Sequence, residues 1–163
     1  MNVKTHVEHG FGPLYDEHSE ILILGSFPSV LSREQGFFYG NPRNRFWAVL
    51  EALCGEKVPE DIEGRRAYCI AHRIALYDAI ESCDIIGSKD DSIENVVPAD
   101  IQTIVKNSRI KRVILNGNAA KRHYLAFQSD IGGVQLYFMP STSPANAAWS
   151  LKRLIDVWET AFN

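Results

Sequence analysis

The sequence lacks a long apolar run, close cysteine pairs and an excess of positive charge. No segment approaches the roughly 20 consecutive apolar residues of a membrane-spanning helix, and no basic and apolar signal segment opens the chain. We therefore expect a cytoplasmic protein that is not held in a membrane. The formal net charge of −3 argues against a large non-specific footprint on nucleic acid, although a local basic patch can serve an acidic chain.

Cysteine is scarce: the chain has three, Cys54, Cys69 and Cys83. An odd number without close pairs argues against a disulfide framework. A zinc or iron–sulfur site would require about four ligands at short spacing, which the sequence does not offer. We therefore predict reduced thiols, no metal and no cofactor.

The length of 163 residues and the hydrophobic content of 45% fit a single domain over residues 1–163, which we expect to be a monomer. Residues 1–19 are polar and contain Gly10, Gly12 and Pro13. This composition predicts an N-terminal arm that does not join the core.

Four short apolar runs predict strands. Residues 21–24, 73–77 and 112–116 are apolar on both faces, whereas residues 134–139 alternate as an edge strand does. Helical patterns occupy 46–53, 59–72, 101–107, 118–127 and 147–162, with Asp100 as a cap of the third. Strands that alternate with helices imply βαβ units. The predicted fold class is α/β, a three-layer α/β/α sandwich around a short, mostly parallel four-stranded sheet.

Small polar stretches follow three of the predicted strands, at residues 25–29, 116–118 and 141–146. In open parallel sheets the ligand site lies beyond the carboxyl ends of the strands. We therefore expect these stretches to form one site. They contain neither a phosphate-binding glycine motif nor a nucleophile elbow, and no lysine that could form a Schiff base.

Aromatic residues alternate with arginine and asparagine between residues 36 and 47. Such a segment suits a surface that stacks on a flat ligand, and asparagine can read a base edge with both a donor and an acceptor. We predict that Tyr39 stacks, whereas Phe46 and Trp47 pack at the start of a helix. Arg43 and Arg45 flank the proposed pocket, where they would contact phosphate.

Three motifs resemble those of the uracil-DNA glycosylase superfamily: Gly-Ser-Phe-Pro-Ser at 25–29, Phe-Tyr-Gly-Asn-Pro-Arg-Asn-Arg-Phe-Trp at 38–47, and Thr-Ser-Pro-Ala-Asn-Ala at 142–147. The segment 75–83, followed by Gly87, Ser88 and Asp90, is similar to the hypoxanthine-DNA glycosylase (deoxyinosine glycosylase) branch. The resemblance spans roughly residues 20–150. It implies a monofunctional enzyme of base excision repair. Such an enzyme flips a deaminated base out of double-stranded DNA and excises it hydrolytically. The implied base is hypoxanthine, with uracil and xanthine as alternatives.

The resemblance also implies roles for single residues. Asn44 would be the catalytic asparagine, with Asn41 as the second candidate. Base contacts are implied for Gly25, Ser26, Phe27, Tyr39 and either Asn116 or Asn118. Contacts to the DNA backbone are implied for Ser29, Ser141, Ser143, Pro144, Ala145 and Asn146.

One position departs from the pattern. Other members of the superfamily carry Asp or Asn two residues after the first glycine, where it positions the attacking water, but this chain has Phe27. Phenylalanine cannot orient water, so we expect Asn44, or Asn41, to orient and polarise it. Asp78 and Asp90 are carboxylate candidates that equally suit a strand-end cap and a turn. The missing acid leaves a second hypothesis open, a catalytically inactive DNA-damage-binding protein of the same fold.

Overall fold

Strand β2 (Ile21–Gly25) is the centre of the computed structural model, which describes residues 3–163. It pairs in parallel with β3 (Ile74–Asp78) and with β6 (Arg112–Asn116). Strand β7 (Gln135–Met139) pairs in parallel with β6 and lies at the edge, in the order β3-β2-β6-β7. The central residues 22–24 are fully buried, as a strand covered on both faces requires. The predicted four-stranded sheet and its edge strand are confirmed.

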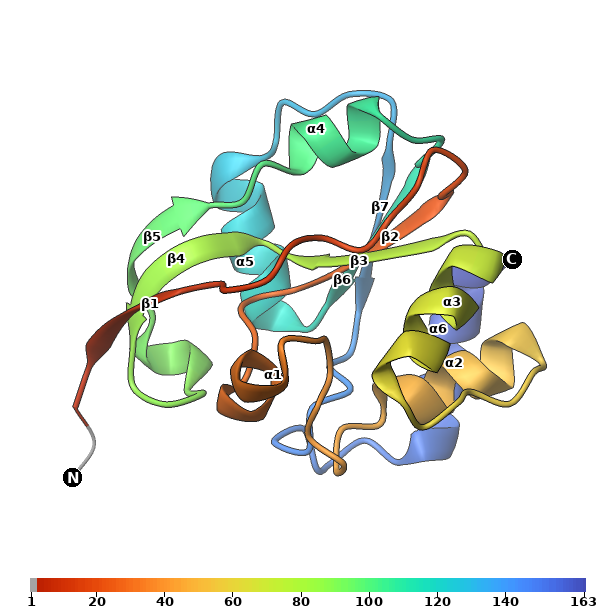
Figure 1. Ribbon diagram of the computed structural model, residues 1–163, viewed down its shortest axis with the longest axis horizontal. Coiled ribbons are helices and arrows are strands. Elements are labelled where there is room, and N and C mark those ends of the chain that lie inside the picture. The colour runs from red at the N-terminus through yellow and green to blue at the C-terminus, as the bar shows by residue number, and fades with distance from the viewer. Residues whose placement is uncertain (1–2) are drawn as a thin grey trace.

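Helices cover both faces of this sheet, which confirms the three-layer sandwich (Figure 1). On one side lie α2 (Phe46–Cys54), α3 (Ile62–Ala71) and α6 (Leu151–Phe162), and on the other α4 (Ile101–Lys106) and α5 (Asn118–Phe127). Side-chain caps fix the starts of α3, α4 and α6. Asp100 caps α4 as predicted, whereas Asp61 and Ser150 start α3 and α6 a few residues later than the periodicity predicted.

A second sheet, which the sequence pattern did not predict, lies beside the first. It is antiparallel and consists of β1 (Thr5–Glu8), β4 (Ile80–Ile85) and β5 (Glu94–Pro98) in the order β1-β4-β5. The chain passes from β3 to β4 through Ala79 alone, whose N–H donates to the carbonyl of Gly25 at 2.8 Å. The short helix α1 (Val30–Gln35) and the 3₁₀ turn η1 (Asp90–Ser92) complete the described elements. The hydrogen bond between Ala79 and Gly25 fixes the end of β3 against the end of β2.

The segment before β2 is more than the predicted arm. Residues 1–2 lie outside the described part of the chain, but β1 pairs with β4, and both His9 and Leu14 are buried. Leu14 exchanges two backbone hydrogen bonds of 2.9 Å with Leu76 of β3. The polar composition was a misleading guide, because the backbone groups of this segment form hydrogen bonds at the edges of the sheets and not with water.

Two further expectations concern cysteine and membranes. The three cysteines are free thiols, and burial raises the pKa of Cys69 to about 12 and that of Cys83 to about 11. No helix between residues 3 and 163 combines the length and the apolar character that crossing a membrane takes.

Candidate active site

A cleft of about 290 Å³ opens at the carboxyl ends of the parallel strands. The loops after β2 and β7, the connection between α1 and α2, and the last residues of β3 and β6 form its walls. Of the residues predicted from the sequence, it brings together Gly25, Ser26, Phe27, Ser29, Tyr39, Asn41, Asn44, Asn116, Ser141, Ser143, Pro144 and Ala145. The strand-end rule therefore located the cleft correctly.

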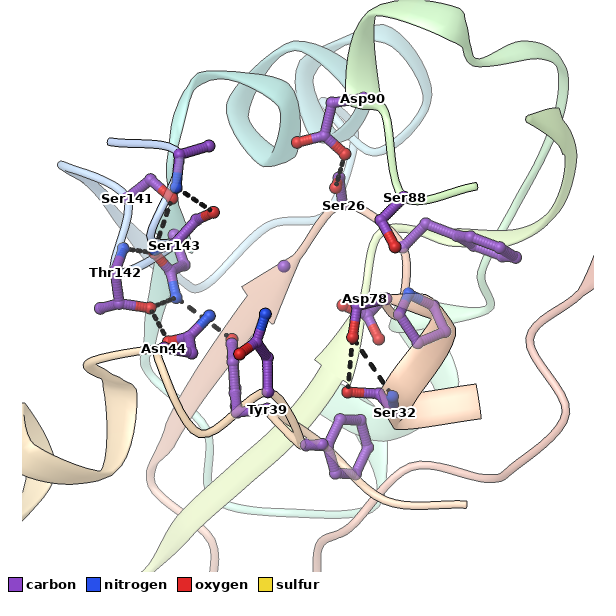
Figure 2. Close-up of a pocket in the computed structure, with 18 of the residues that line it drawn as sticks. Ser26, Ser32, Tyr39, Asn44, Asp78, Ser88, Asp90, Ser141, Thr142 and Ser143 are labelled. Carbon is purple, nitrogen blue, oxygen red and sulfur yellow. Dashed lines mark hydrogen bonds between the residues drawn. The ribbon is translucent and has the colours of Figure 1, made fainter. Parts of the chain in front are cut away.

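One side of the cleft, which we call the amide wall, contains Tyr39, Asn44 and Thr142, as Figure 2 shows. It also contains Asn116, which is hydrogen-bonded to Tyr39 and Thr142. The N–H of Thr142 donates to Oδ1 of Asn116 at 3.0 Å, which fixes the orientation of that amide. Its Nδ2 then donates to Thr142 Oγ1 at 3.0 Å and to the Tyr39 hydroxyl at 3.3 Å. Since both N–H groups of Asn116 are occupied, this residue orients its neighbours instead of presenting free donors to a base.

Asn44 has a free donor where Asn116 has none. Its Oδ1 accepts the backbone N–H of Phe46 at 2.9 Å and the hydroxyl of Thr142 at 2.8 Å. A backbone N–H can only donate, so the oxygen of the side chain must lie on that side. The Nδ2 group of Asn44 makes no hydrogen bond within residues 3–163, and Asn44 lines the cleft. The residue is therefore both a local cap of α2 and a source of N–H donors for a ligand.

Tyr39 supplies an aromatic ring to the same wall. One face of the ring stacks on Phe46, with centroids 3.9 Å apart and planes inclined by 16°. Its backbone has φ +52°, in the left-handed region that a bulky residue seldom occupies, and Trp47 Nε1 donates to its carbonyl at 3.2 Å. Burial raises the pKa of the hydroxyl, which therefore stays protonated near neutral pH. The ring is therefore held rigidly, and Tyr39 lines the cleft.

The opposite side of the cleft, the acidic wall, contains two carboxylates. Asp78, the last residue of β3, is buried and accepts a hydrogen bond of 2.7 Å at Oδ2 from Nε2 of the fully buried His9. Asp90, in the exposed η1 turn, accepts the hydroxyl of Ser26 at 2.8 Å. Partial burial of its carboxyl raises the pKa of Asp90, and the nearby charge of Asp78 acts in the same direction.

Phe27 lines the cleft but packs into the protein. It is 8% exposed and belongs to a small apolar cluster with Ile80, Cys83 and Ile85. Its ring also meets that of His9 edge-on, with centroids 6.1 Å apart. Phe27 therefore packs against the antiparallel sheet and also lines the cleft, and its contact with the base stays a prediction.

Serines line the mouth of the cleft in short loop motifs. Ser141 Oγ accepts the N–H of Ser143, and Ser143 Oγ accepts the N–H of Ala145, each at 3.1 Å. Neither hydroxyl donates to another group in the described part of the chain, so both can donate to a ligand. Ser29 instead caps α1 and donates to Ser32 Oγ at 3.1 Å.

The two arginines predicted to meet phosphate differ. The guanidinium of Arg45 donates to the carbonyls of Ser143 at 2.8 Å and Asn146 at 3.0 Å, and also to that of Trp149. It therefore holds the loop after β7, which occupies donors of Arg45 within the protein, and its phosphate contact stays a prediction. Arg43 is exposed, and its guanidinium has no hydrogen bond or ion pair between residues 3 and 163, so it stays available.

Two predicted residues lie elsewhere. Asn118 begins α5 and lines a neighbouring groove of about 530 Å³, and Asn146 lines the same groove. The side chain of Asn146 donates to the carbonyl of Ser141 at 3.0 Å, which makes it part of the loop's own framework. Of the alternatives Asn116 and Asn118, the structure places only Asn116 at the cleft.

Sequence reasoning missed Thr142 and His9. Thr142 lies within the predicted loop at 141–146, but a loop sequence does not reveal that its side chain joins two asparagines. His9 belonged to the segment interpreted as an arm, and its neighbour in space, Asp78, is 69 positions away in the chain. Within residues 3–163, no three His, Cys, Asp or Glu side chains are grouped in a way that could hold a metal ion.

Comparison with known proteins matches this chain to one family. The family profile described as Uracil DNA glycosylase superfamily covers residues 13–161. Two curated relatives named hypoxanthine DNA glycosylase, from Methanosarcina acetivorans and Methanosarcina barkeri, are each 30% identical over 158 residues. The alignments cover 96% and 95% of this chain and 98% of each relative.

A solved structure extends the likeness to the fold. It is the solution NMR structure of a proposed uracil DNA glycosylase from Methanosarcina acetivorans, with a TM-score of 0.82 and 29% identity. The match covers 97% of both chains.

Proposed function

The chain belongs to the uracil DNA glycosylase superfamily and is a DNA N-glycosylase, and we propose that it excises hypoxanthine from double-stranded DNA in base excision repair. The observation that supports this most is the amide wall, because the oxygen of Asn44 is held by two donors while its N–H groups face the cleft unpaired. The two relatives named hypoxanthine DNA glycosylase favour hypoxanthine over uracil and xanthine.

The reaction begins with extrusion of the damaged nucleotide. Unstacking costs a few kcal/mol, less for a mispaired base, which favours deaminated bases over normal ones. In our proposal the extruded base lies against the face of the Tyr39 ring opposite Phe46. Stacking on Phe46 already fixes the Tyr39 ring before the base binds. Because the ring does not have to be ordered on binding, little of the stacking energy is lost.

Cleavage of the N-glycosidic bond leaves positive charge on the sugar and negative charge on the departing base. Hydrogen-bond donors aimed at that base stabilise the transition state by about 3 kcal/mol for one good donor. Asn44 Nδ2 is such a donor, fixed in advance by Phe46 and Thr142. We had expected Asn44 to orient water, but its acceptor oxygen is already occupied, so we assign it to the leaving base. Asn41 is the second candidate, since it also lines the cleft.

Contacts to the DNA backbone come from the mouth of the cleft. The hydroxyls of Ser141 and Ser143 have unused donors there, beside Pro144 and Ala145. Arg43, which lies in the chain between the lining residues Asn41 and Asn44, adds an exposed guanidinium. Phosphate contacts of this kind fix register without reading sequence. Since few cations take part, we expect contacts to the extruded base to supply much of the affinity for DNA. We also expect the protein to act as a monomer.

The test is release of free base from duplexes that each contain one hypoxanthine, uracil or xanthine, under single-turnover conditions. We expect hypoxanthine to be released fastest, leaving an intact strand that breaks only in alkali. Among the described residues no lysine lines the cleft, so borohydride should trap no adduct. We also expect EDTA to leave the rate unchanged. Uracil released ten times faster than hypoxanthine would refute the preference. A gel shift without release from any duplex would favour the inactive damage-binding protein.

A further inference from the structure

Hydrolysis needs a group that takes a proton from the attacking water, and Asn44 cannot do so. A neutral amide is not a base near neutral pH, and its oxygen is occupied by two donors. Among the residues that line the cleft, Asp78 and Asp90 are the carboxylates, and none is histidine, glutamate or lysine. The choice of the base therefore lies between these two aspartates.

We propose that Asp78 accepts the proton of the attacking water through Oδ1, an assignment that rests on the proposed glycosylase reaction. His9 holds Oδ2 at 2.7 Å, and His9 itself is fully buried. Oδ1 has no donor within the described residues 3–163, and Asp78 lines the cleft. One oxygen thus anchors the carboxylate, and the other is left for a water molecule.

The position of Oδ1 places it near the ring proposed to hold the base. A Cβ built on Gly25 would lie 2.6 Å from Asp78 Oδ1 and 3.7 Å from the Tyr39 hydroxyl, so both oxygens approach the same point at the end of β2. The register that pairs Gly25 with Asp78 across β2 and β3 creates this proximity. A base stacked on Tyr39 would bring the C1′ atom of its deoxyribose to the same end of the cleft.

Asp90 is placed less favourably. It lies in an exposed turn, borders both the cleft and the neighbouring groove, and receives the hydroxyl of Ser26. Figure 2 shows Asp90 at the far end of the cleft from Tyr39 and Asn44, whereas Asp78 lies closer to Tyr39. A carboxylate that takes a proton from water beside the sugar should be shielded from bulk solvent, which favours the buried Asp78 over the exposed Asp90.

The step balances without a co-reactant. The C1′–N bond breaks and its electron pair leaves with the base, which Asn44 stabilises. The water oxygen forms the new bond to C1′, and its proton moves to Asp78 Oδ1. Before it takes this proton, the negatively charged Asp78 also stabilises the positive charge on the sugar. The proton afterwards passes to solvent, which restores the carboxylate.

The experiment compares variants in single-turnover release of whichever base the wild type removes fastest. We expect Asp78→Asn, which keeps an acceptor for His9, to be slower by at least about a hundredfold, as loss of a general base entails. Its affinity for the lesion duplex should stay within about threefold, because asparagine matches the shape of the aspartate that it replaces. In Asp78→Ala, sodium formate should raise the rate at least tenfold over sodium chloride at equal ionic strength. The reason is that free formate can enter the space left by the side chain and act as the carboxylate base.

The matched control is Asp84→Asn. Asp84 also pairs with a histidine, His6, at 3.0 Å, but it lies in β4 away from the cleft, so its rate should not change. A rate for Asp78→Asn within threefold of an active wild type would overturn the proposal. So would a slow Asp78→Ala that formate does not rescue, or a loss confined to Asp90→Asn. Absence of base release by the wild type from every duplex would instead overturn the glycosylase function together with this step.

Discussion

The two walls of the cleft offer opposite groups. The amide wall presents donors, with the Asn44 amide held by Phe46 and Thr142 and the Tyr39 ring held by Phe46. The acidic wall presents acceptors, with Asp78 anchored by His9 and Asp90 by Ser26. Among residues 3–163, Asn44 Nδ2 in the amide wall and Asp78 Oδ1 in the acidic wall have no hydrogen-bond partner, and both residues line the cleft.

This difference matches the charge that develops in the reaction. The departing base gains negative charge and needs donors, whereas the sugar gains positive charge and the water must lose a proton. A cleft lined by donors alone would bind an anion, and one lined by carboxylates alone would repel the DNA backbone. The division between the walls is therefore the feature that we expect variants to break.

The largest effect in the amide wall is expected at Asn44. Asn44→Asp keeps the acceptor for Phe46 and Thr142 but replaces the donor with negative charge, so we expect a loss of more than about a hundredfold in single-turnover rate at a nearly unchanged melting temperature. Asn44→Ala should lose about a hundredfold and also melt about 2–4 °C lower, because it removes a cap. An Asn44→Asp variant that retained the wild-type rate would show that the amide is only a cap, and the catalytic assignment would move to Asn41.

The acidic wall can be disturbed without removing a carboxylate. In Gly25→Ala the new methyl group would lie 2.6 Å from Asp78 Oδ1 and displace it. We expect a rate loss on the order of tenfold to a hundredfold, as a small displacement of a reacting group produces. Gly12→Ala is the matched control, because its Cβ would meet nothing within 4 Å. Equal rates for the two variants would contradict the placement of Asp78.

A smaller effect is expected at Tyr39, which holds the base and not the charge. Tyr39→Ala should cost about 1–3 kcal/mol in the free energy of the transition state, the range for a lost stacking partner. Tyr39→Phe keeps the ring, so its rate should fall little, while it loses about 1 kcal/mol of stability because Asn116 loses an acceptor. Equal rate losses in the two variants would indicate that the hydroxyl, and not stacking, matters.

The smallest effect separates two neighbouring arginines outside the walls. Arg43→Ala should weaken binding of all duplexes alike and lower the slope of log K against log salt by about 1, with no change in melting temperature. Arg45→Ala should instead lower the melting temperature, by about 2–4 °C for each kcal/mol lost, since its guanidinium holds the loop after β7. The reverse pattern in calorimetry and salt titration would contradict the structure.

Periodicity predicted most of the parallel sheet and its helices, because residues 21–24, 73–77 and 112–116 are apolar on both faces. It failed for the antiparallel sheet. Strands β1 and β5 are largely exposed, so their sequences have little apolar patterning, and their pairing with β4 depends on contacts distant in the chain. Helix starts at Ile62 and Leu151 were missed because side-chain caps, and not periodicity, decide them.

The site was predictable at the level of loops but not of side-chain direction. Strand-end logic placed Gly25, Asn116 and Ser141 in one cleft, whereas Tyr39 and Asn44 were predicted from the aromatic segment and the family resemblance. It could not distinguish Arg43 from Arg45, since the direction of a guanidinium depends on carbonyls about 100 positions away. The anchor of Asp78 was missed for the same reason.

Binding of two abasic-site analogues tests the division between the walls most directly. One duplex carries a pyrrolidine, which is cationic like the sugar in the transition state, and the other a neutral tetrahydrofuran. We predict that the wild type binds the cationic duplex at least about tenfold more tightly, as an enzyme complementary to the transition state does. The preference should disappear in Asp78→Asn and persist in Asn44→Ala. Equal affinities for the two duplexes, or a preference that Asn44→Ala removes and Asp78→Asn retains, would contradict the assignment of charge to the two walls.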